Sequence, residues 1–437
     1  MSDEPLAIEP QTAAYLAAFA AMPPRENQTI DDLRAGYKDE LVRSAGAPDP
    51  AVAWRPLTLP GTAGDMAGRL YVPLRADHGG PLILYVHGGG FAVGDLESHD
   101  GLARLIAGAS GLKVMTIDYR RAPENPFPAA RDDVLAAFRW AAQNSAALDI
   151  DPSRIVLAGE SAGAAHAVSS ALTLRGEAVT PRAVWIMSPA LDATCSGDSY
   201  QTFATGAGRT AAEFAYLWSL YAPDAATHSS PEVSPGLADP TGLPPLYIYT
   251  SEFDPARSDG EAFGDKARAA GVPVVARRRA GLIHQHPEIT GVSDASRAAV
   301  VEAAREVAAD LLASPSTTPD IILKPEDIDF QPFNIPGFSG DTRAAFVNVD
   351  TTRAPFIALL KMAPGAVLKR HFHPRAMEAV HVMEGTMIND GKPLPAGSFL
   401  IHGPGVWHGP HVAPEGGCTL MFIQYPGVGP DDSVFID

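Results

Sequence analysis

The chain lacks several features that would assign it to a special class of protein. Only two cysteines, Cys195 and Cys418, occur among 437 residues, which excludes a disulfide framework and fits a reducing compartment. No uninterrupted apolar stretch reaches the roughly 18 residues that a membrane-spanning helix needs. The first five residues include acidic side chains and no basic segment, so no secretory leader is expected. These absences predict a cytoplasmic protein.

Basic side chains are scarce relative to acidic ones. The sequence has 33 Lys and Arg against 51 Asp and Glu, a formal net charge of −18. Binding to nucleic acid requires clustered Lys and Arg, so nucleic acid is excluded as a partner. The same negative charge disfavours anionic membranes and favours a neutral small molecule as substrate.

The hydrophobic residues, 46% of the chain, are enough for two domains, because 437 residues exceed what one core normally supports. Residues 1–45 show two helical apolar patterns and are interpreted as a helical cap segment. Residues 46–313 alternate strand and helix patterns, which predicts an α/β domain with a mostly parallel sheet. Residues 314–322 are a predicted linker that begins with a Pro-rich stretch. Residues 323–437 contain strands punctuated by Gly and Pro, which predicts an all-β barrel.

Two motifs in the α/β region follow apolar strand patterns. One is the Gly-Glu-Ser-Ala-Gly sequence of residues 159–163, and the other is the His-Gly-Gly-Gly-Phe sequence of residues 87–91. A serine on a sharp strand-to-helix turn presents its hydroxyl above the end of a parallel sheet. A glycine run offers unhindered backbone N–H groups to a developing oxyanion. The pair predicts acyl transfer with Ser161 as the nucleophile.

A general base and its orienting acid follow the serine in the expected order. Asp254 comes after the apolar stretch of residues 246–250, and His284 comes after the stretch of residues 272–276. Each is therefore expected near the carboxyl end of a strand, beside Ser161. We interpret His284 as the general base and later acid, and Asp254 as the group that fixes the imidazole tautomer.

These motifs resemble the bacterial hormone-sensitive-lipase-like carboxylesterases of the α/β-hydrolase fold. The resemblance covers roughly residues 5–313 and includes further segments typical of that family. The segments are residues 118–124, 127–130 and 188–192. The resemblance implies an oxyanion hole formed by the backbone N–H groups of Gly88, Gly89 and Ala162. It also implies that the N-terminal helical cap is mobile.

A few residues near these motifs depart from the family pattern. Glu160 replaces the more common Asp, and His166 replaces a common Asn. Gln285 and His286 follow the catalytic histidine in place of Gly-Phe, so substrate preference is open while the reaction class is not. Glu160 is expected to point away from the reaction. His87 is interpreted as a residue that braces the glycine loop.

The C-terminal region contains a second set of polar residues. The residues Gly365, His371, His373, Glu378 and Gly385 have the spacing of the first cupin motif, and Gly397, Gly405 and His408 have most of the second. Three imidazoles and one carboxylate inside a small barrel suit a divalent transition metal. The predicted ligands are His371, His373, Glu378 and His408. His402 and His411 stay unassigned, and the alternative of a cupin without metal stays open.

The segment of residues 377–385 is similar to small bacterial cupins of the anti-sigma-factor and dioxygenase-like type, which implies Zn, Fe or Mn. We therefore expect a serine carboxylesterase for short-chain, bulky or aromatic esters, with a metal-binding cupin that shapes access or stability. Ester hydrolysis itself should need no cofactor. The alternatives are a bifunctional enzyme whose cupin acts on a hydrolysis product, and a ligand sensor. The sequence also leaves a homodimer open.

Overall fold

The chain forms two compact units, Met1–Pro315 and Ser316–Asp437. A computed structural model describes residues 7–20, 29–74, 76–313, 328–333, 337–348, 356–374, 376–425 and 434–435. The predicted linker, residues 314–322, lies outside the described residues. No described helix is both long enough and apolar enough to cross a bilayer.

The first unit is built on a sheet whose described strands have the order β1-β2-β4-β3-β5-β6-β7-β8. Pairing is parallel from β4 to β8 in this order and antiparallel along β1, β2 and β4, so the predicted mostly parallel sheet is confirmed. The strands are β1 Val52–Gly61, β2 Gly64–Pro73, β3 Gly80–Val86, β4 Lys113–Ile117, β5 Ile150–Glu160, β6 Ala183–Met187, β7 Leu246–Phe253 and β8 Val274–Ile283.

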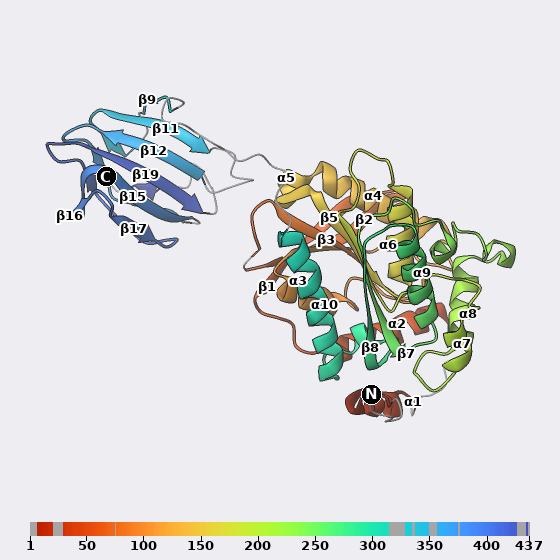
Figure 1. The fold of residues 1–437 in the computed structure, drawn as a ribbon. Helices are drawn as coiled ribbons and strands as arrows, with labels where there is room; N and C mark the ends of the chain where they lie inside the picture. Colours follow the sequence, from red (N-terminus) through yellow and green to blue (C-terminus); the bar gives the residue numbers. More distant parts are fainter. Residues whose placement is uncertain are drawn as a thin grey trace. The chain divides into compact units, whose positions relative to one another are not determined.

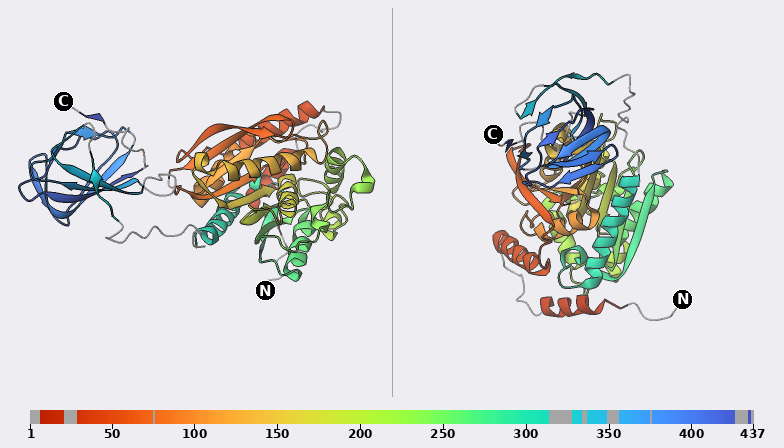
Figure 2. Two further views of the ribbon diagram at one scale, coloured as in Figure 1. Left: turned by 90° about the horizontal axis from the view of Figure 1, so that it is seen from above. Right: turned by 90° about the vertical axis from the view of Figure 1, so that its left-hand side faces the viewer.

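Helices cover both faces of this sheet (Figure 1 and Figure 2). They are α3 Asp100–Ser110, α4 Ala129–Gln143, α5 Ser145–Leu148, α6 Ala162–Thr173, α7 Asp198–Thr202, α8 Ala211–Tyr221, α9 Arg257–Ala269 and α10 Asp294–Ala313. Strand β3 is buried along its whole length because successive side chains point to opposite faces and both faces are covered. Leu82 and Leu84 join the core under α4, α6 and α9, whereas Ile83 and Tyr85 join the core under α3 and α10.

Two helices precede the sheet, at the positions that the apolar patterns predict. They are α1 Pro10–Ala20 and α2 Ile30–Ser44, and residues 21–28 between them lie outside the described residues. The start of α2 is fixed by a capping box, in which the Thr29 side chain accepts from the Asp32 N–H while the Asp32 side chain accepts from Thr29. Tyr37 and Leu41 of α2 are buried. This helix is therefore packed into the first unit.

The second unit is a β structure in which every described strand pair is antiparallel. Its strands are β9 Gln331–Pro332, β10 Phe338–Ser339, β11 Thr342–Asn348, β12 Phe356–Met362, β13 Val367–Leu368, β14 His371–Phe372, β15 Met377–Asn389, β16 Lys392–Pro395, β17 Phe399–His402, β18 His411–Val412, β19 Cys418–Tyr425 and β20 Val434–Phe435. The long strand β15 pairs with β17 and β19 near its start and with β16 and β18 near its end. Its inward side chains, among them Val380 and Val382, form the core with Leu420 and Phe422.

Candidate functional site

Ser161 occupies a sharp turn between β5 and α6. Its backbone has φ 53° and ψ −119°, a conformation that L-residues rarely adopt and that costs on the order of 1–3 kcal/mol. Glycines on both sides make the turn possible. A Cβ at Gly163 would lie 2.1 Å from the Val86 carbonyl oxygen, and one at Gly159 would lie 2.5 Å from the Gly163 carbonyl carbon. Close backbone approach to β3 therefore requires glycine at both positions.

The structure brings the three predicted catalytic side chains into one hydrogen-bonded chain. Asp254 follows β7 and His284 follows β8, as Ser161 follows β5. His284 Nδ1 lies 2.9 Å from Asp254 Oδ2, and His284 Nε2 lies 2.8 Å from Ser161 Oγ. Because a carboxylate only accepts, Nδ1 carries the proton and Nε2 is left to accept the serine hydroxyl. All three side chains are buried, which keeps water from competing for these bonds.

The glycine loop differs from the prediction at one residue. The Gly88 N–H donates to Glu160 Oε1 at 2.5 Å, so it is not available to an oxyanion and its predicted role is wrong. Gly89, Gly90 and Ala162 line the cavity that contains Ser161. No hydrogen bond of the described residues uses the N–H of Gly89 or Gly90. The sequence prediction did not name Gly90, because a run of three glycines does not show which of them line the cavity.

Glu160 does not line the cavity that contains Ser161, and its carboxylate instead binds the glycine loop through the Gly88 N–H. Its carboxylate also accepts from the Tyr85 hydroxyl at 2.5 Å and lies 3.0 Å from His99 Nε2. Burial alone would lower the pKa of His99, but the adjacent Glu160 carboxylate raises it above its usual value. A buried carboxylate thus holds the loop in place from below. No local pattern in the sequence indicates these contacts, since Tyr85 and His99 come from distant segments.

Ser161 lines a cavity of about 610 Å³. Most of its wall is apolar and includes Phe91, Phe214, Leu217 and Trp218, and the Phe214 ring meets the His284 ring edge to face at 4.9 Å. Helix α2 contributes Leu33 and Tyr37, and α8 contributes most of the aromatic wall. Tyr37, Arg209 and Glu288 add a polar region.

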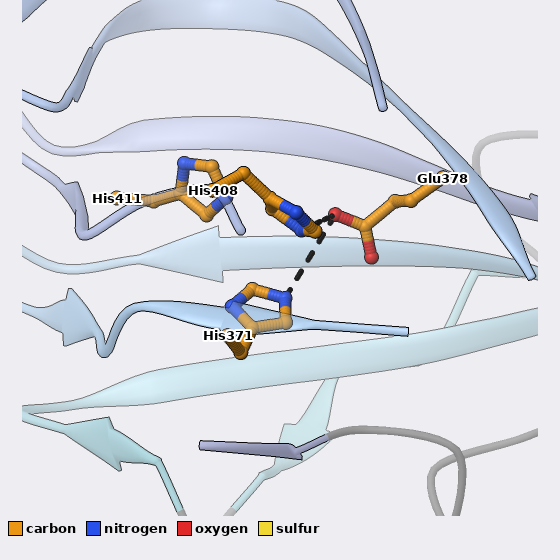
Figure 3. A group of neighbouring side chains, drawn as sticks. All are labelled: His371, Glu378, His408 and His411. Atoms are coloured by element: carbon orange, nitrogen blue, oxygen red, sulfur yellow. Dashed lines mark hydrogen bonds and ion pairs between the residues drawn. The ribbon is translucent and has the colours of Figure 1, made fainter. Parts of the chain in front are cut away.

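Four buried side chains of the second unit form a candidate metal centre (Figure 3). One ligand atom from each of His371, Glu378, His408 and His411 lies within 4.8 Å of every other. Glu378 Oε1 is 3.0 Å from His408 Nε2 and 3.9 Å from His371 Nε2. Burial lowers the pKa of His371 to about 4 and that of His411 to about 3, so both rings are neutral, as metal binding requires.

The backbone places two of these histidines side by side. The His371 N–H donates to the His408 carbonyl at 3.0 Å, and the His408 N–H donates back at 2.9 Å. Each ring also lies with Nδ1 2.9 Å from a backbone carbonyl, that of Lys369 for His371 and that of Val406 for His408. Because a carbonyl only accepts, each Nδ1 carries a proton, and Nε2 is left as the nitrogen that would bind an ion beside Glu378. The donor set therefore fits a divalent transition metal.

His373 lies next to the other oxygen of the same carboxylate. Its Nε2 is 2.9 Å from Glu378 Oε2, and Gln424 Nε2 donates to that oxygen at 3.2 Å. His373 is therefore close to the predicted ligands but outside the group of mutually close ligand atoms. His411, which the sequence left unassigned, belongs to the group.

Comparison with known proteins identifies the family. Esterase LipI of Mycobacterium tuberculosis is 34% identical over 306 residues, which are 68% of this chain and 92% of that protein. The chain belongs to the hormone-sensitive-lipase-like α/β-hydrolase esterases. The ethyl acetate hydrolase of Pseudomonas putida is 30% identical over 316 residues, 69% of this chain and 99% of that protein. The family model of the alpha/beta hydrolase fold matches residues 83–287, and that of the ChrR cupin-like domain matches residues 318–427.

Solved structures agree with this family. The thermostable esterase from Pseudomonas putida ECU1011 has a TM-score of 0.66 and 29% identity, and the match covers 71% of this chain and 99% of that one. The ester-hydrolase EH1AB1 from the metagenome of Lake Arreo has a TM-score of 0.67 and 30% identity, with 70% of this chain and 100% of that one covered. The protein is a serine carboxylic ester hydrolase with a C-terminal cupin domain, so the predicted family, fold class and enzyme class are confirmed.

The contacts of Glu160 lead to a first prediction. Replacing Glu160 by Gln keeps the side-chain shape but removes the charge that holds the Gly88 N–H and pairs with His99. We expect kcat for p-nitrophenyl butyrate to fall by about 10-fold with little change in KM, which is less than the ~100-fold cost of losing an oxyanion donor itself. Glu177→Gln is the matched control, because Glu177 pairs with Arg139 on the surface. An unchanged kcat in Glu160→Gln would show that the loop does not depend on this carboxylate.

Proposed function

We propose that the esterase hydrolyses short-chain esters with a bulky or aromatic group through an acyl-enzyme intermediate on Ser161. The observation that supports this mechanism is the unbroken hydrogen-bond chain from Ser161 Oγ through His284 to Asp254. Ser161 Oγ attacks the ester carbonyl while His284 Nε2 takes its proton, and the same nitrogen then protonates the leaving alcohol. Water repeats the sequence on the acyl-enzyme and releases the acid. Asp254 stabilises the imidazolium that forms in each half.

The oxyanion hole of this proposal consists of the backbone N–H groups of Gly89, Gly90 and Ala162. Ala162 is the first residue of α6, so its N–H has no acceptor within the helix. Three N–H groups in a mostly apolar cavity stabilise a developing negative charge more strongly than water-exposed donors do. No metal or other cofactor is needed for these steps.

The proposed substrate class follows from the cavity. Its volume of about 610 Å³ accommodates a small acyl group together with a ring-sized alcohol, and the aromatic side chains Phe91, Phe214 and Trp218 provide the apolar contacts. The glycine run leaves this space open, since a Cβ at Gly90 would lie 2.3 Å from Leu217 Cδ1. These contacts favour a neutral ester over a charged one.

The nucleophile is tested by replacing Ser161 with Ala. Because members of a catalytic triad act as a unit, kcat for p-nitrophenyl butyrate should fall on the order of a million-fold. The fold should be unchanged, which circular dichroism checks. Activity within tenfold of the wild type would rule out Ser161 as the nucleophile.

The substrate class is tested by filling the cavity. Leu217→Trp should lower kcat/KM for phenyl acetate at least about 10-fold more than for ethyl acetate, because the added ring occupies the space of the alcohol. Leu312→Trp serves as control, since Leu312 is exposed on α10.

The wild-type enzyme provides a second test of the substrate class. Its kcat/KM should decline from p-nitrophenyl butyrate to p-nitrophenyl dodecanoate. Preference for the dodecanoate, or equal loss for both acetates in Leu217→Trp, would contradict the proposed class.

We also propose that the cupin domain binds Zn²⁺, Fe²⁺ or Mn²⁺. The donor set of buried imidazoles and one carboxylate suits these ions. A bound ion of this kind supplies Lewis acidity and cross-links the strands that carry its ligands. Since the proposed triad lies wholly in the first unit, ester hydrolysis does not depend on that ion. In this proposal the cupin domain affects the access of substrate to the esterase site or the stability of the protein.

Metal removal tests this separation. The double variant His371→Ala/His373→Ala should lose metal, measured by elemental analysis, and should melt at a lower temperature, because metal binding is coupled to folding. Its turnover of p-nitrophenyl acetate should stay within about threefold of the wild type, which corresponds to a change of less than about 1 kcal/mol in the activation free energy. Truncation after Ala313 should reduce activity on large esters, or solubility, more than turnover of the small one. A folded, metal-free double variant as inactive as Ser161→Ala would instead place the cupin in the reaction.

A further inference from the structure

His411 carries an imidazole that ester hydrolysis does not use. It lies in β18, where its backbone pairs with Leu368 of β13 and Asn389 of β15, and its side chain is fully buried. Within the described part of the chain, neither ring nitrogen has a hydrogen-bond partner. Buried polar groups are almost always satisfied, and an exception calls for a specific explanation such as a bound ion.

The position of His411 supplies that explanation. A ring nitrogen of His411 is within 4.8 Å of the ligand atoms of His371, Glu378 and His408. Ligand nitrogens bound to one tetrahedral Zn²⁺ at about 2.1 Å lie roughly 3.4 Å apart, so the group is at most about 1.4 Å too wide. Figure 3 shows the three rings on one side of the Glu378 carboxylate. Small side-chain shifts suffice to enclose a cation.

The two oxygens of Glu378 face different partners. Oε1 faces His408 and His371, whereas Oε2 lies 2.9 Å from His373 Nε2 and accepts from Gln424. A carboxylate held at one oxygen presents the other in a fixed direction. Oε1 is therefore the oxygen oriented toward the space that His371, His408 and His411 share.

We infer that His411 is a ligand of the cupin's cation, together with His371, His408 and Oε1 of Glu378. The inference rests on the proposed metal binding of this domain and assigns a residue that the two cupin motifs do not contain. His411 then adds to the donors of the first cupin motif, among which His373 lies 2.9 Å from the other oxygen of Glu378. The unpartnered nitrogens of His411 are then accounted for, because one of them binds the cation.

His402 provides a matched comparison. Its ring stacks on that of His408 at 4.0 Å, and its Nε2 also has no hydrogen-bond partner in the described residues. It does not, however, belong to the group of mutually close ligand atoms. His402 therefore shares the neighbourhood and the packing of His411 without the geometry of a ligand.

The test uses the full-length chain with Zn²⁺ and Co²⁺ as probes. Competition with a chromophoric chelator should show that His411→Phe binds Zn²⁺ more than about 100-fold more weakly than the wild type, beyond the 10–100-fold range of outer-sphere changes. His402→Phe should stay within about 10-fold of the wild type. Phe retains most of the ring volume beside Phe422, and circular dichroism checks that both variants fold.

A second variant replaces the ligand rather than removing it. In His411→Cys, bound Co²⁺ should show the near-ultraviolet thiolate-to-metal charge-transfer absorption that arises only when sulfur coordinates the ion. The wild type, with Cys195 and Cys418 in place, should not show it. If residue 411 had only a structural role, the His411→Cys variant would not show this absorption.

Three outcomes would overturn the inference. Wild-type Zn²⁺ affinity in His411→Phe together with no charge-transfer band in His411→Cys would show that residue 411 is not a ligand. An equal loss of Zn²⁺ affinity in His402→Phe would show that the loss in His411→Phe comes from altered packing and not from the loss of a ligand. A wild type that binds neither Zn²⁺ nor Co²⁺ would remove the proposed metal binding as well, which distinguishes that failure from the failure of His411 alone.

Discussion

The close backbone approach between the end of β3 and the turn after β5 is the constraint on which the esterase site depends. Only glycine at 159 and 163 lets the start of α6 come against the Val86 carbonyl, and only then does Ser161 reach its strained conformation. The strain is held by burial on all sides and by the neighbouring parallel strands. Because β3 and β5 are adjacent in the sheet, the same approach brings the glycine loop after β3 beside the serine. One contact thus positions both Ser161 and the glycine loop.

A buried charge supports this arrangement from below. The Glu160 carboxylate is bound by the Gly88 N–H, the Tyr85 hydroxyl and His99, so its negative charge is compensated where water cannot reach it. Burial also raises the pKa of Glu288, whose carboxylate accepts from the Tyr37 hydroxyl of α2. Hydrogen bonds between polar side chains therefore connect helix α2 to the residue run that contains His284. Helix α2 and the segment after β8 therefore both line the cavity.

The order of motifs along the chain predicted the hydrolase fold, and it named three side chains, Ser161, Asp254 and His284, that the structure brings together, because parallel strands bring their carboxyl ends to one edge. It did not predict that the Gly88 N–H is bonded to Glu160, whose other partners Tyr85 and His99 are distant in sequence. Likewise, the polar part of the cavity made by Tyr37, Arg209 and Glu288 comes from three separate segments. The spacing of residues along the sequence does not predict contacts between side chains from such separate segments.

In the cupin domain, too, the spacing of the motif residues predicts only part of the site. The spacing of His371, His373 and Glu378 predicts three side chains on neighbouring strands, but it cannot tell which oxygen of Glu378 each histidine meets. Backbone pairing of His371 with His408 decides that these two share Oε1, and the pairing of β18 with β15 brings His411 to the same side. A motif therefore specifies donors near a carboxylate, whereas strand register selects which of them can bind one ion. For this domain the register brings His411, a residue outside both motifs, close to His371, Glu378 and His408.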